Sequence, residues 1–309
     1  MPALCFFFVV RAFAQEPSCL HRTLPLSVED AKGFQVQGLI PADFQAKLRD
    51  TPVKILSIVP DERPHRIVIL VDASGSMAEK WGRVLAPAST LAESNLPNTE
   101  LALLIFGTSI YEQIGFSEGH TLIARRLRQL TKDSKDATKF VHGKTALYDS
   151  LLAGLQLLGT TTSADIIYVI SDGGDNASRA HVDELTRRLT ASGVRLFVSL
   201  VVSEAGQRSR TPEEVQGPTD LSELVRKTGG EIIEPFGLRA YVDAKVMEQV
   251  SAALNNFHHN MLHASLLEVE LPGPPDKKRN WELKPSAENR KRWKDVRIIY
   301  PEELEPCKL

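Results

Sequence analysis

One short stretch of the sequence places three oxygen-bearing side chains directly after an apolar run. Residues Ile67 to Val71 are all apolar, and the run ends in Asp72. Ser74 and Ser76 follow at alternate positions, with Gly75 between them to permit a tight turn. A carboxylate and two hydroxyls that converge on one point are the hard oxygen ligands that Mg²⁺ and Ca²⁺ prefer. The stretch therefore predicts a divalent-cation site.

Two later segments place similar side chains where another strand ends and where a helix begins. A second apolar run ends in Asp172, and Gly173 and Gly174 open the loop that follows. Thr145 stands at the start of an amphipathic pattern and offers another hydroxyl. Because the carboxyl ends of parallel strands share one edge of a sheet, the three segments would bring two carboxylates and three hydroxyls together.

Each of these residues also has an ordinary structural role. Serine is common in turns and at helix N-termini, and Asp72 alone could cap a helix. The cation site is favoured by the five side chains together rather than by any one of them. Two further carboxylates stand nearby. Asp149 fits a helix residue that supports the loop before it, and Asp175 fits either loop structure or a partner of a metal ligand.

Strand and helix patterns alternate from Arg66 to about His258, and these elements must position the site. Runs of Val, Ile and Leu between amphipathic helices are typical of a parallel sheet covered on both faces. The sequence therefore predicts a doubly wound, mostly parallel α/β domain. The predicted strands are residues 66–72, 100–107, 109–116, 164–172, 194–202 and 231–235, and the predicted helices are residues 80–95, 120–130, 145–158, 182–193 and 244–257.

The segments on either side of this domain have the short, alternating patterns of antiparallel strands. Such patterns occur at residues 34–48, 53–59, 262–273, 281–285 and 296–301. Neither flank alone is large enough for its own core. Because the domain begins with a central strand and ends with a helix, the chain enters and leaves at the pole opposite the predicted site. We therefore expect the two flanks to meet there in one small β module.

The first residues resemble a secretory signal. A short apolar core, Leu4–Val10, precedes the small residues Ala12 and Ala14, so cleavage after Ala14 is expected. The pattern departs from an ordinary signal because no basic residue precedes the core and Arg11 follows it. A buried N-terminal strand or a misassigned start is the alternative interpretation. With cleavage the protein is expected to be secreted or periplasmic.

The predicted boundaries follow from these patterns. They are a signal peptide at residues 1–14, an N-terminal flank at 15–64, the α/β domain at 65–258 and a C-terminal flank at 259–309 that packs with 15–64. Signal removal would leave two cysteines, Cys19 and Cys307, near the two ends of the chain. In an exported protein these two could form a disulfide, and free thiols are the alternative.

Composition sets wider limits on the function. The chain has 309 residues, of which 42% are hydrophobic and 25% charged, so it can bury a core of ordinary size. Its formal charge of -2 gives no electrostatic reason to expect nucleic acid as a partner. After the signal, no apolar run approaches the roughly 20 residues of a spanning helix.

Three motifs together resemble the von Willebrand factor type A domain. The sequence "DASGS" at 72–76 matches the D-x-S-x-S metal motif of that family, "GKTALYD" at 143–149 matches its threonine loop, and "SDGGDN" at 171–176 matches its aspartate loop. The three motifs stand in the family order, and the likeness covers about residues 66–257. The whole chain also resembles exported bacterial proteins with related domains.

The resemblance implies a function and a set of ligands. The implied metal-ion-dependent adhesion site consists of Asp72, Ser74, Ser76, Thr145 and Asp172. It would hold Mg²⁺, or alternatively Mn²⁺ or Ca²⁺, and bind a Glu or Asp side chain of a protein partner. We therefore expect an exported, metal-dependent protein-binding module that is not an enzyme. A scaffold that folds around the metal without an acidic partner, and a hydrolase that uses the metal to activate water, are the alternatives.

Two other motifs carry less weight. The "GKT" at 143–145 lacks the glycine that a phosphate-binding loop needs five positions earlier, where Thr138 stands. His259 and His263 have the spacing of two metal ligands on a helix, but no zinc-protease pattern surrounds them. A solvated helix end is the expected role of these histidines.

Overall fold

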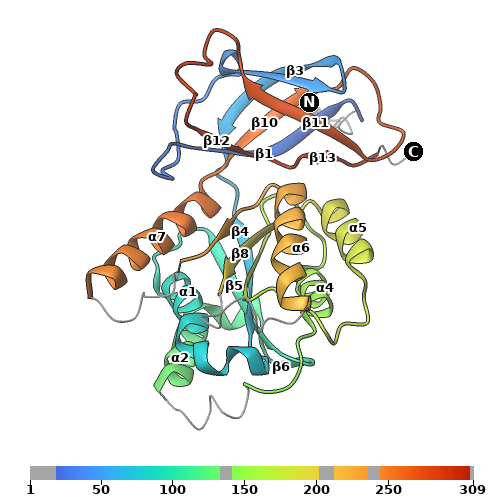
Figure 1. Cartoon of the computed structure of the whole chain (residues 1–309). Coiled ribbons are helices and arrows are strands. Elements are labelled where there is room, and N and C mark those ends of the chain that lie inside the picture. Colours follow the sequence, from blue (N-terminus) through green and yellow to red (C-terminus); the bar gives the residue numbers. More distant parts are fainter. Residues whose placement is uncertain (1–18, 133–140, 202–211, 236–243, 307–309) are drawn as a thin grey trace, which may run out of the picture.

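The structure of the chain is a computed structural model that describes residues 19–132, 141–201, 212–235 and 244–306. It contains a six-stranded sheet flanked by helices, and a seven-stranded sheet lies at one end of this unit (Figure 1). The predicted signal peptide at residues 1–14 lies outside the described residues, and so does Cys307.

The six-stranded sheet is parallel except at one edge. Its order is β6-β5-β4-β7-β8-β9, and only β6 runs antiparallel to its neighbour. All residues of β7 and β8 are buried, which explains why these strands read as continuous apolar runs. The expected α/β class is therefore confirmed. The strands are β4 (His65–Asp72), β5 (Thr99–Phe106), β6 (Ile110–Ile114), β7 (Ile166–Ser171), β8 (Arg195–Leu200) and β9 (Ile232–Ile233).

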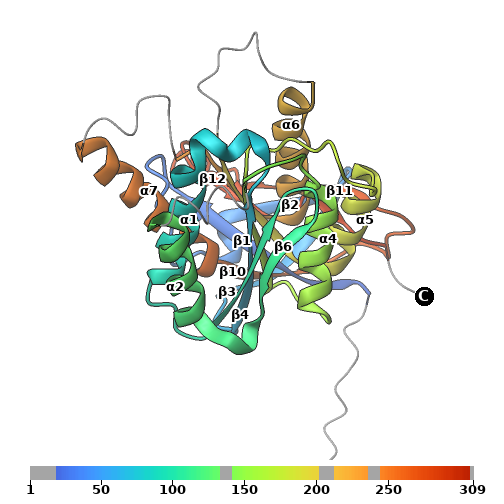
Figure 2. The same ribbon diagram turned by 90° about the horizontal axis from the view of Figure 1, so that it is seen from below.

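Helices cover both faces of this sheet (Figure 2). Because side chains alternate along a strand, Ile67 and Ile69 of β4 pack in one core cluster and Val68 and Leu70 in the other. Helices α1, α2 and α7 contribute to the first cluster, and α4, α5 and α6 contribute to the second. The helices are α1 (Trp81–Glu93), α2 (Gly119–Lys132), α4 (Leu147–Leu158), α5 (Val182–Ser192), α6 (Pro212–Thr228) and α7 (Ala244–Leu262).

Two helices differ from the sequence-based prediction. Helix α6 was not expected, because Gly217 and Pro218 interrupt its apolar pattern. It forms nevertheless, since Leu221, Leu224 and Val225 pack in the second core cluster. Helix α7 runs beyond the predicted end at residue 257, as far as Leu262.

The seven-stranded sheet is built from both ends of the chain. Its order is β12-β1-β10-β3-β2-β11-β13 and every pair is antiparallel, so β10 from the C-terminal flank lies between β1 and β3 from the N-terminal flank. Buried side chains from both flanks, including Leu26, Val53, Leu267 and Trp281, share one cluster. The strands are β1 (His21–Glu29), β2 (Phe44–Leu48), β3 (Thr51–Pro60), β10 (Ser265–Glu270), β11 (Arg279–Pro285), β12 (Arg297–Ile299) and β13 (Glu303–Leu304).

The strand pattern expected over residues 34–48 is only partly strand. Residues 44–48 form β2, but residues 41–43 form a short 3-10 helix, η1 (Pro41–Asp43), because Pro41 starts a turn there. Strand β1, which precedes this region, was not expected from the sequence. It is held in the sheet by its pairing with β10 and β12.

Polar contacts join this sheet to the α/β unit. Arg297 of β12 bridges Glu29 of β1 and Glu231, which stands just before β9. Asn260 of α7 donates to the same Glu29 carboxylate at 2.8 Å. Both glutamates are buried. The two units are therefore connected through a partly buried charged cluster, in which the glutamates are buried and Arg297 is exposed, as well as through the chain itself.

Of the two cysteines in the predicted disulfide, only Cys19 is among the residues that the structure describes. Cys19 is disulfide-bonded, and Arg22 contacts both the Cys19 sulfur, at 3.7 Å, and the backbone carbonyl of Glu305, at 3.1 Å. The start of the first flank and the end of the second therefore lie side by side. The pairing of Cys19 with Cys307 stays a prediction.

In the described parts of the chain, none of the helices combines the length and the apolar character that crossing a membrane requires.

Candidate metal centre

The two predicted carboxylates lie at the same edge of the six-stranded sheet. Strand β4 ends at Asp72, and its parallel neighbour β7 ends at Ser171, one residue before Asp172. The Asp72 side chain has no exposed surface, and Asp172 is also buried. The two carboxylates are close enough to interact electrostatically. The parallel register of the strands therefore brings together residues that lie far apart in the chain.

Asp72 holds the first loop in place. One of its carboxylate oxygens accepts a hydrogen bond from the backbone N–H of Ser74 at 2.8 Å. The other accepts from the Ser171 hydroxyl at 2.6 Å. The hydroxyl oxygens of Ser74 and Ser76 lie 3.2 Å apart, within hydrogen-bond distance of each other. Asp72 thus orients the loop that presents the two hydroxyls.

Backbone hydrogen bonds connect this loop to the segment that carries Thr145. The N–H of Gly75 donates to the carbonyl of Gly143 at 3.0 Å, and the N–H of His142 donates to the carbonyl of Ala73 at 3.1 Å. A Cβ atom on Gly75 would lie 3.1 Å from the Gly143 oxygen. The glycine is therefore explained by this close approach rather than by the tight turn that the sequence suggested.

The third loop connects to Thr145 in the same way. The Asn176 side chain accepts a hydrogen bond from the Thr145 N–H at 2.9 Å, and the Asn176 N–H donates to the Thr145 carbonyl at 3.0 Å. Thr145 itself is buried. The three predicted segments are thus adjacent and hydrogen-bonded to one another, with Thr145 between the other two loops.

A buried lysine, which the sequence analysis did not identify, also belongs to this group. The Lys80 ammonium lies 3.3 Å from one carboxylate oxygen of Asp172, and the two side chains are 9% and 8% exposed. The other Asp172 oxygen accepts from the Gly174 N–H at 3.3 Å. Lys80 ends the short 3-10 helix η2 (Gly75–Lys80) that follows the serine loop. No local signal in the sequence identifies it, because its partner Asp172 lies 92 residues away in the chain.

The buried charges alter the acid–base behaviour of the first aspartate. Burial and the nearby Asp172 carboxylate raise the pKa of Asp72 to about 7. Its hydrogen bonds with Ser171 and Ser74 oppose this shift but do not cancel it. A cation beside both carboxylates would relieve the same repulsion.

The donor set fits a hard divalent cation. Buried carboxylates and two converging hydroxyls supply oxygen ligands only, which suits Mg²⁺, Mn²⁺ or Ca²⁺ better than a softer metal. Within the described ranges, no group of three or more His, Cys, Asp or Glu side chains is placed to hold a metal ion. The predicted set contains only two carboxylates and depends on hydroxyl oxygens for the rest.

Comparison with known proteins identifies this part of the chain. Residues 67–174 match the family described as the von Willebrand factor type A domain. The matched region begins in β4 and ends at Gly174, so it includes the first two loops and the start of the third, with Asp172. The chain carries a von Willebrand factor type A (VWA) domain. The comparison with curated proteins found no match to this sequence.

Comparison with solved structures finds matches to bacterial and human proteins. An aerotolerance-related membrane protein from Bacteroides fragilis NCTC 9343 is 16% identical, with a TM-score of 0.39, and the match covers 63% of this chain and 98% of that one. BatB from Bacteroides thetaiotaomicron is 17% identical, with a TM-score of 0.40 and the same coverage. The human COPII-coat protein Sec24c is 9% identical, with a TM-score of 0.43, and the match covers 79% of this chain and 44% of that one.

Asp149 and Asp175 stabilise loops next to the candidate site. The Asp149 carboxylate accepts hydrogen bonds from the backbone N–H groups of Arg179 and Ala180, both at 3.0 Å. Asp175 accepts from the Ser178 hydroxyl at 2.5 Å and from the Tyr148 N–H at 3.2 Å. Both carboxylates therefore tie the start of α4 to the loop after β7. These contacts account for Asp149 and Asp175 without direct metal binding.

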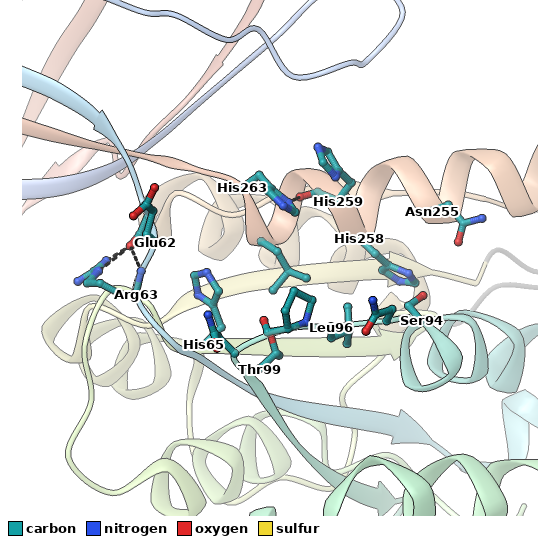
Figure 3. A pocket seen from close by; sticks show the side chains of 15 residues that line it. Glu62, Arg63, His65, Ser94, Leu96, Thr99, Asn255, His258, His259 and His263 are labelled. Carbon is teal, nitrogen blue, oxygen red and sulfur yellow. Dashed lines mark hydrogen bonds and ion pairs between the residues drawn. The ribbon is translucent and has the colours of Figure 1, made fainter.

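A separate cavity lies at the opposite pole of the VWA domain, where strands β4 and β5 begin (Figure 3). It has a volume of about 580 Å³ and is lined by His65, His258, His259 and His263, among others. His259 and His263 are exposed and stacked, with ring centroids 3.9 Å apart, as expected for a solvated helix end. His258, in contrast, is buried against Tyr168. This cavity is distinct from the candidate metal centre.

Proposed function

We propose that this chain is an exported protein-binding module that recognises an acidic side chain of its partner through a divalent cation. The observation that carries the proposal is the convergence of three hydrogen-bonded loops on one edge of the sheet, with two buried carboxylates and two facing hydroxyls. The VWA domain match supports the same class of function, because such domains generally take part in protein interactions.

Each residue has a distinct role in this proposal. Ser74 and Ser76 would bind the cation directly, because their hydroxyl oxygens lie only 3.2 Å apart and could reach the same ion. Asp72 would orient them through the hydrogen bonds that both of its oxygens accept, and it would supply negative charge to the cation. Thr145 and Asp172 would complete the set, with one of them reaching the cation through water. Mg²⁺ is the proposed ion, with Mn²⁺ or Ca²⁺ as alternatives.

A bound divalent cation would supply an open coordination position for a Glu or Asp oxygen of the partner. The exposed loops around the site would then provide specificity, since binding residues commonly stand on loops held by a rigid scaffold. The rigid part here is the sheet, whose strands β4 and β7 are buried along almost their whole length.

The flanks support a role outside the cytoplasm. We propose that residues 15–64 and 259–309 act as one β module that holds both ends of a doubly wound VWA domain. The shared core cluster of the two flanks and the disulfide-bonded Cys19 support this arrangement. A disulfide is typical of exported proteins, which agrees with the signal-like first residues. Secretion or a periplasmic location is therefore part of the proposal.

The variant Asp172→Ala tests the proposed function. We expect it to abolish Mg²⁺-dependent capture of the partner from an envelope fraction of the source cell, because the cation loses a carboxylate. Capture would be measured with and without chelator, and circular dichroism would report the fold. Asp183→Ala is the matched control, since Asp183 is an exposed carboxylate on α5.

The same experiment separates the alternative functions. Undiminished capture by folded Asp172→Ala in Mg²⁺ buffer would contradict the proposal. A scaffold predicts that chelator lowers the melting temperature of the wild type and that no partner is captured. A hydrolase predicts turnover of chromogenic esters or phosphates that disappears in an Asp72 variant.

A further inference from the structure

The metal centre contains a cation of its own. Lys80 places its ammonium 3.3 Å from Asp172, and both side chains are almost completely buried. Among the described residues, the buried charged side chains at this pole are Asp72, Asp172 and Lys80. A buried lysine without a carboxylate partner is costly, so this ion pair is part of the folded structure rather than a loose surface contact.

The ion pair limits how Asp172 can bind a metal. One of its oxygens faces the ammonium, and the other accepts a hydrogen bond from the Gly174 N–H. A divalent cation beside Asp172 must therefore either share this carboxylate with Lys80 or bind it through an intervening water. In both cases the fixed positive charge of Lys80 opposes the entry of a second cation.

The same charge has the opposite effect on an incoming carboxylate. With both aspartates ionised, the three buried side chains carry one net negative charge, and a divalent cation converts this into one net positive charge. Without Lys80 the loaded group would be neutral. A partner's carboxylate is attracted more strongly to the loaded group with Lys80, which is positive, than to the neutral group without it. The difference is large because little water screens charges in a buried site.

We propose that Lys80 sets the charge of the loaded metal centre: it weakens binding of the divalent cation and strengthens binding of the acidic ligand. The inference rests on the proposed function and deepens it, because it makes a residue outside the three motifs a determinant of specificity. Lys80 is a positioning residue in this role, since it acts through Asp172 and the local field.

Lys80→Met tests this, because methionine retains an apolar stem of similar length and removes the charge. The purified full chain would be titrated with Mn²⁺, and free Mn²⁺ would be followed by electron paramagnetic resonance. We expect the variant to bind Mn²⁺ at least about tenfold more tightly than the wild type. Acetate would then be added to the Mn²⁺-loaded protein. Water proton relaxation would report the loss of water molecules from the Mn²⁺ ion as acetate binds. We expect several-fold weaker acetate binding by the variant.

Two controls separate charge from packing. Lys80→Arg keeps the charge and should resemble the wild type in both titrations, whereas Lys132→Met changes an exposed lysine at the end of α2 and should change neither. Melting curves in chelator would report the fold. If Lys80→Met unfolds, Lys80→Gln, which retains a polar end, would take its place.

The outcomes distinguish this inference from the proposed function. Equal or weaker Mn²⁺ binding by folded Lys80→Met, beside a wild type that binds, overturns the role of Lys80 and leaves the metal site in place. Acetate binding that is unchanged also overturns it. Absence of Mn²⁺ binding in every variant overturns the proposed function, and the inference with it.

Discussion

Asp72 is a single residue whose burial affects the stability of the metal-free fold. Its carboxylate is buried beside a second carboxylate, and its pKa is raised as a result. A carboxyl group with a raised pKa in the folded state stabilises the fold only at pH values low enough to protonate it. That contribution is lost as pH rises through the folded-state pKa. Near and above neutral pH, the metal-free protein therefore carries an unfavourable charge at the end of β4.

We expect Asp72→Asn to stabilise the protein in chelator at pH 8 by about 1–2 kcal/mol, while Mn²⁺ binding is lost. The amide can still accept from the Ser74 N–H and can donate to the Ser171 hydroxyl, so the loop contacts have a substitute. Urea unfolding and an Mn²⁺ titration would measure the two effects. Asp183→Asn is the control for a carboxylate at the surface. A destabilised variant that still binds Mn²⁺ would refute this account of Asp72.

At the scale of elements, helix α6 holds the loop that carries Asp172. Gly217 of α6 lies so close to this loop that a Cβ atom would stand 1.9 Å from the carbonyl oxygen of Gly173. Gly173 itself has a positive φ of 88°, a conformation that glycine adopts without strain. The position of the second carboxylate is thus fixed by the contact between a loop and a helix that share no sequence motif.

We predict that Gly217→Ala displaces the loop and lowers Mn²⁺ affinity by at least about tenfold, because an error of about 1 Å in a binding group is costly. Isothermal titration would measure the affinity, and circular dichroism the helix content. Gly82→Ala on α1 is the matched control, since its Cβ would meet nothing within 4 Å. That change should preserve affinity and stabilise the fold by up to about 1 kcal/mol. Equal affinities in both variants would show that α6 does not position the loop.

At the scale of the whole molecule, a carboxylate pair joins the β module to the VWA domain. Burial and the nearby Glu29 carboxylate raise the pKa of Glu231 to about 8, although Arg297 bonds to both groups. In the unfolded chain, the pKa of a glutamate side chain is about 4.3. Since the folded state binds the proton more tightly, this group contributes stability below about pH 4.3, and the contribution is lost as pH rises towards 8. The junction is therefore expected to weaken on the alkaline side.

We expect Glu231→Gln to raise the melting temperature relative to the wild type at pH 8 and to have little effect at pH 4.5. Glutamine resembles the protonated carboxyl group and can still meet Glu29 and Arg297. Differential scanning calorimetry across this range would measure the effect. Glu234→Gln, at an exposed position three residues later, is the control. A difference between wild type and variant that does not grow with pH would exclude Glu231 as the responsible group.

Patterns within single segments were sufficient to predict the α/β class and the loops of the candidate site. Continuous apolar runs such as Ile67–Val71 indicate strands buried on both faces, and the ends of such runs place Asp72 and Asp172 at one edge of the sheet. Each of these inferences depends on neighbours within a few residues, which a sequence displays directly. For the same reason the sequence did not predict β1 or α6, whose formation depends on distant partners.

What the sequence determined by itself is the α/β class of the central domain and the chemistry of five oxygen-bearing side chains. Tertiary structure alone decided the charges that surround them. Lys80 contacts Asp172, which lies 92 positions later in the chain, and Arg297 bridges Glu29 of the β module and Glu231 of the VWA domain. The physical reason is that electrostatic and packing contacts depend on distance in space, whereas local patterns report only which face of a strand or helix is buried.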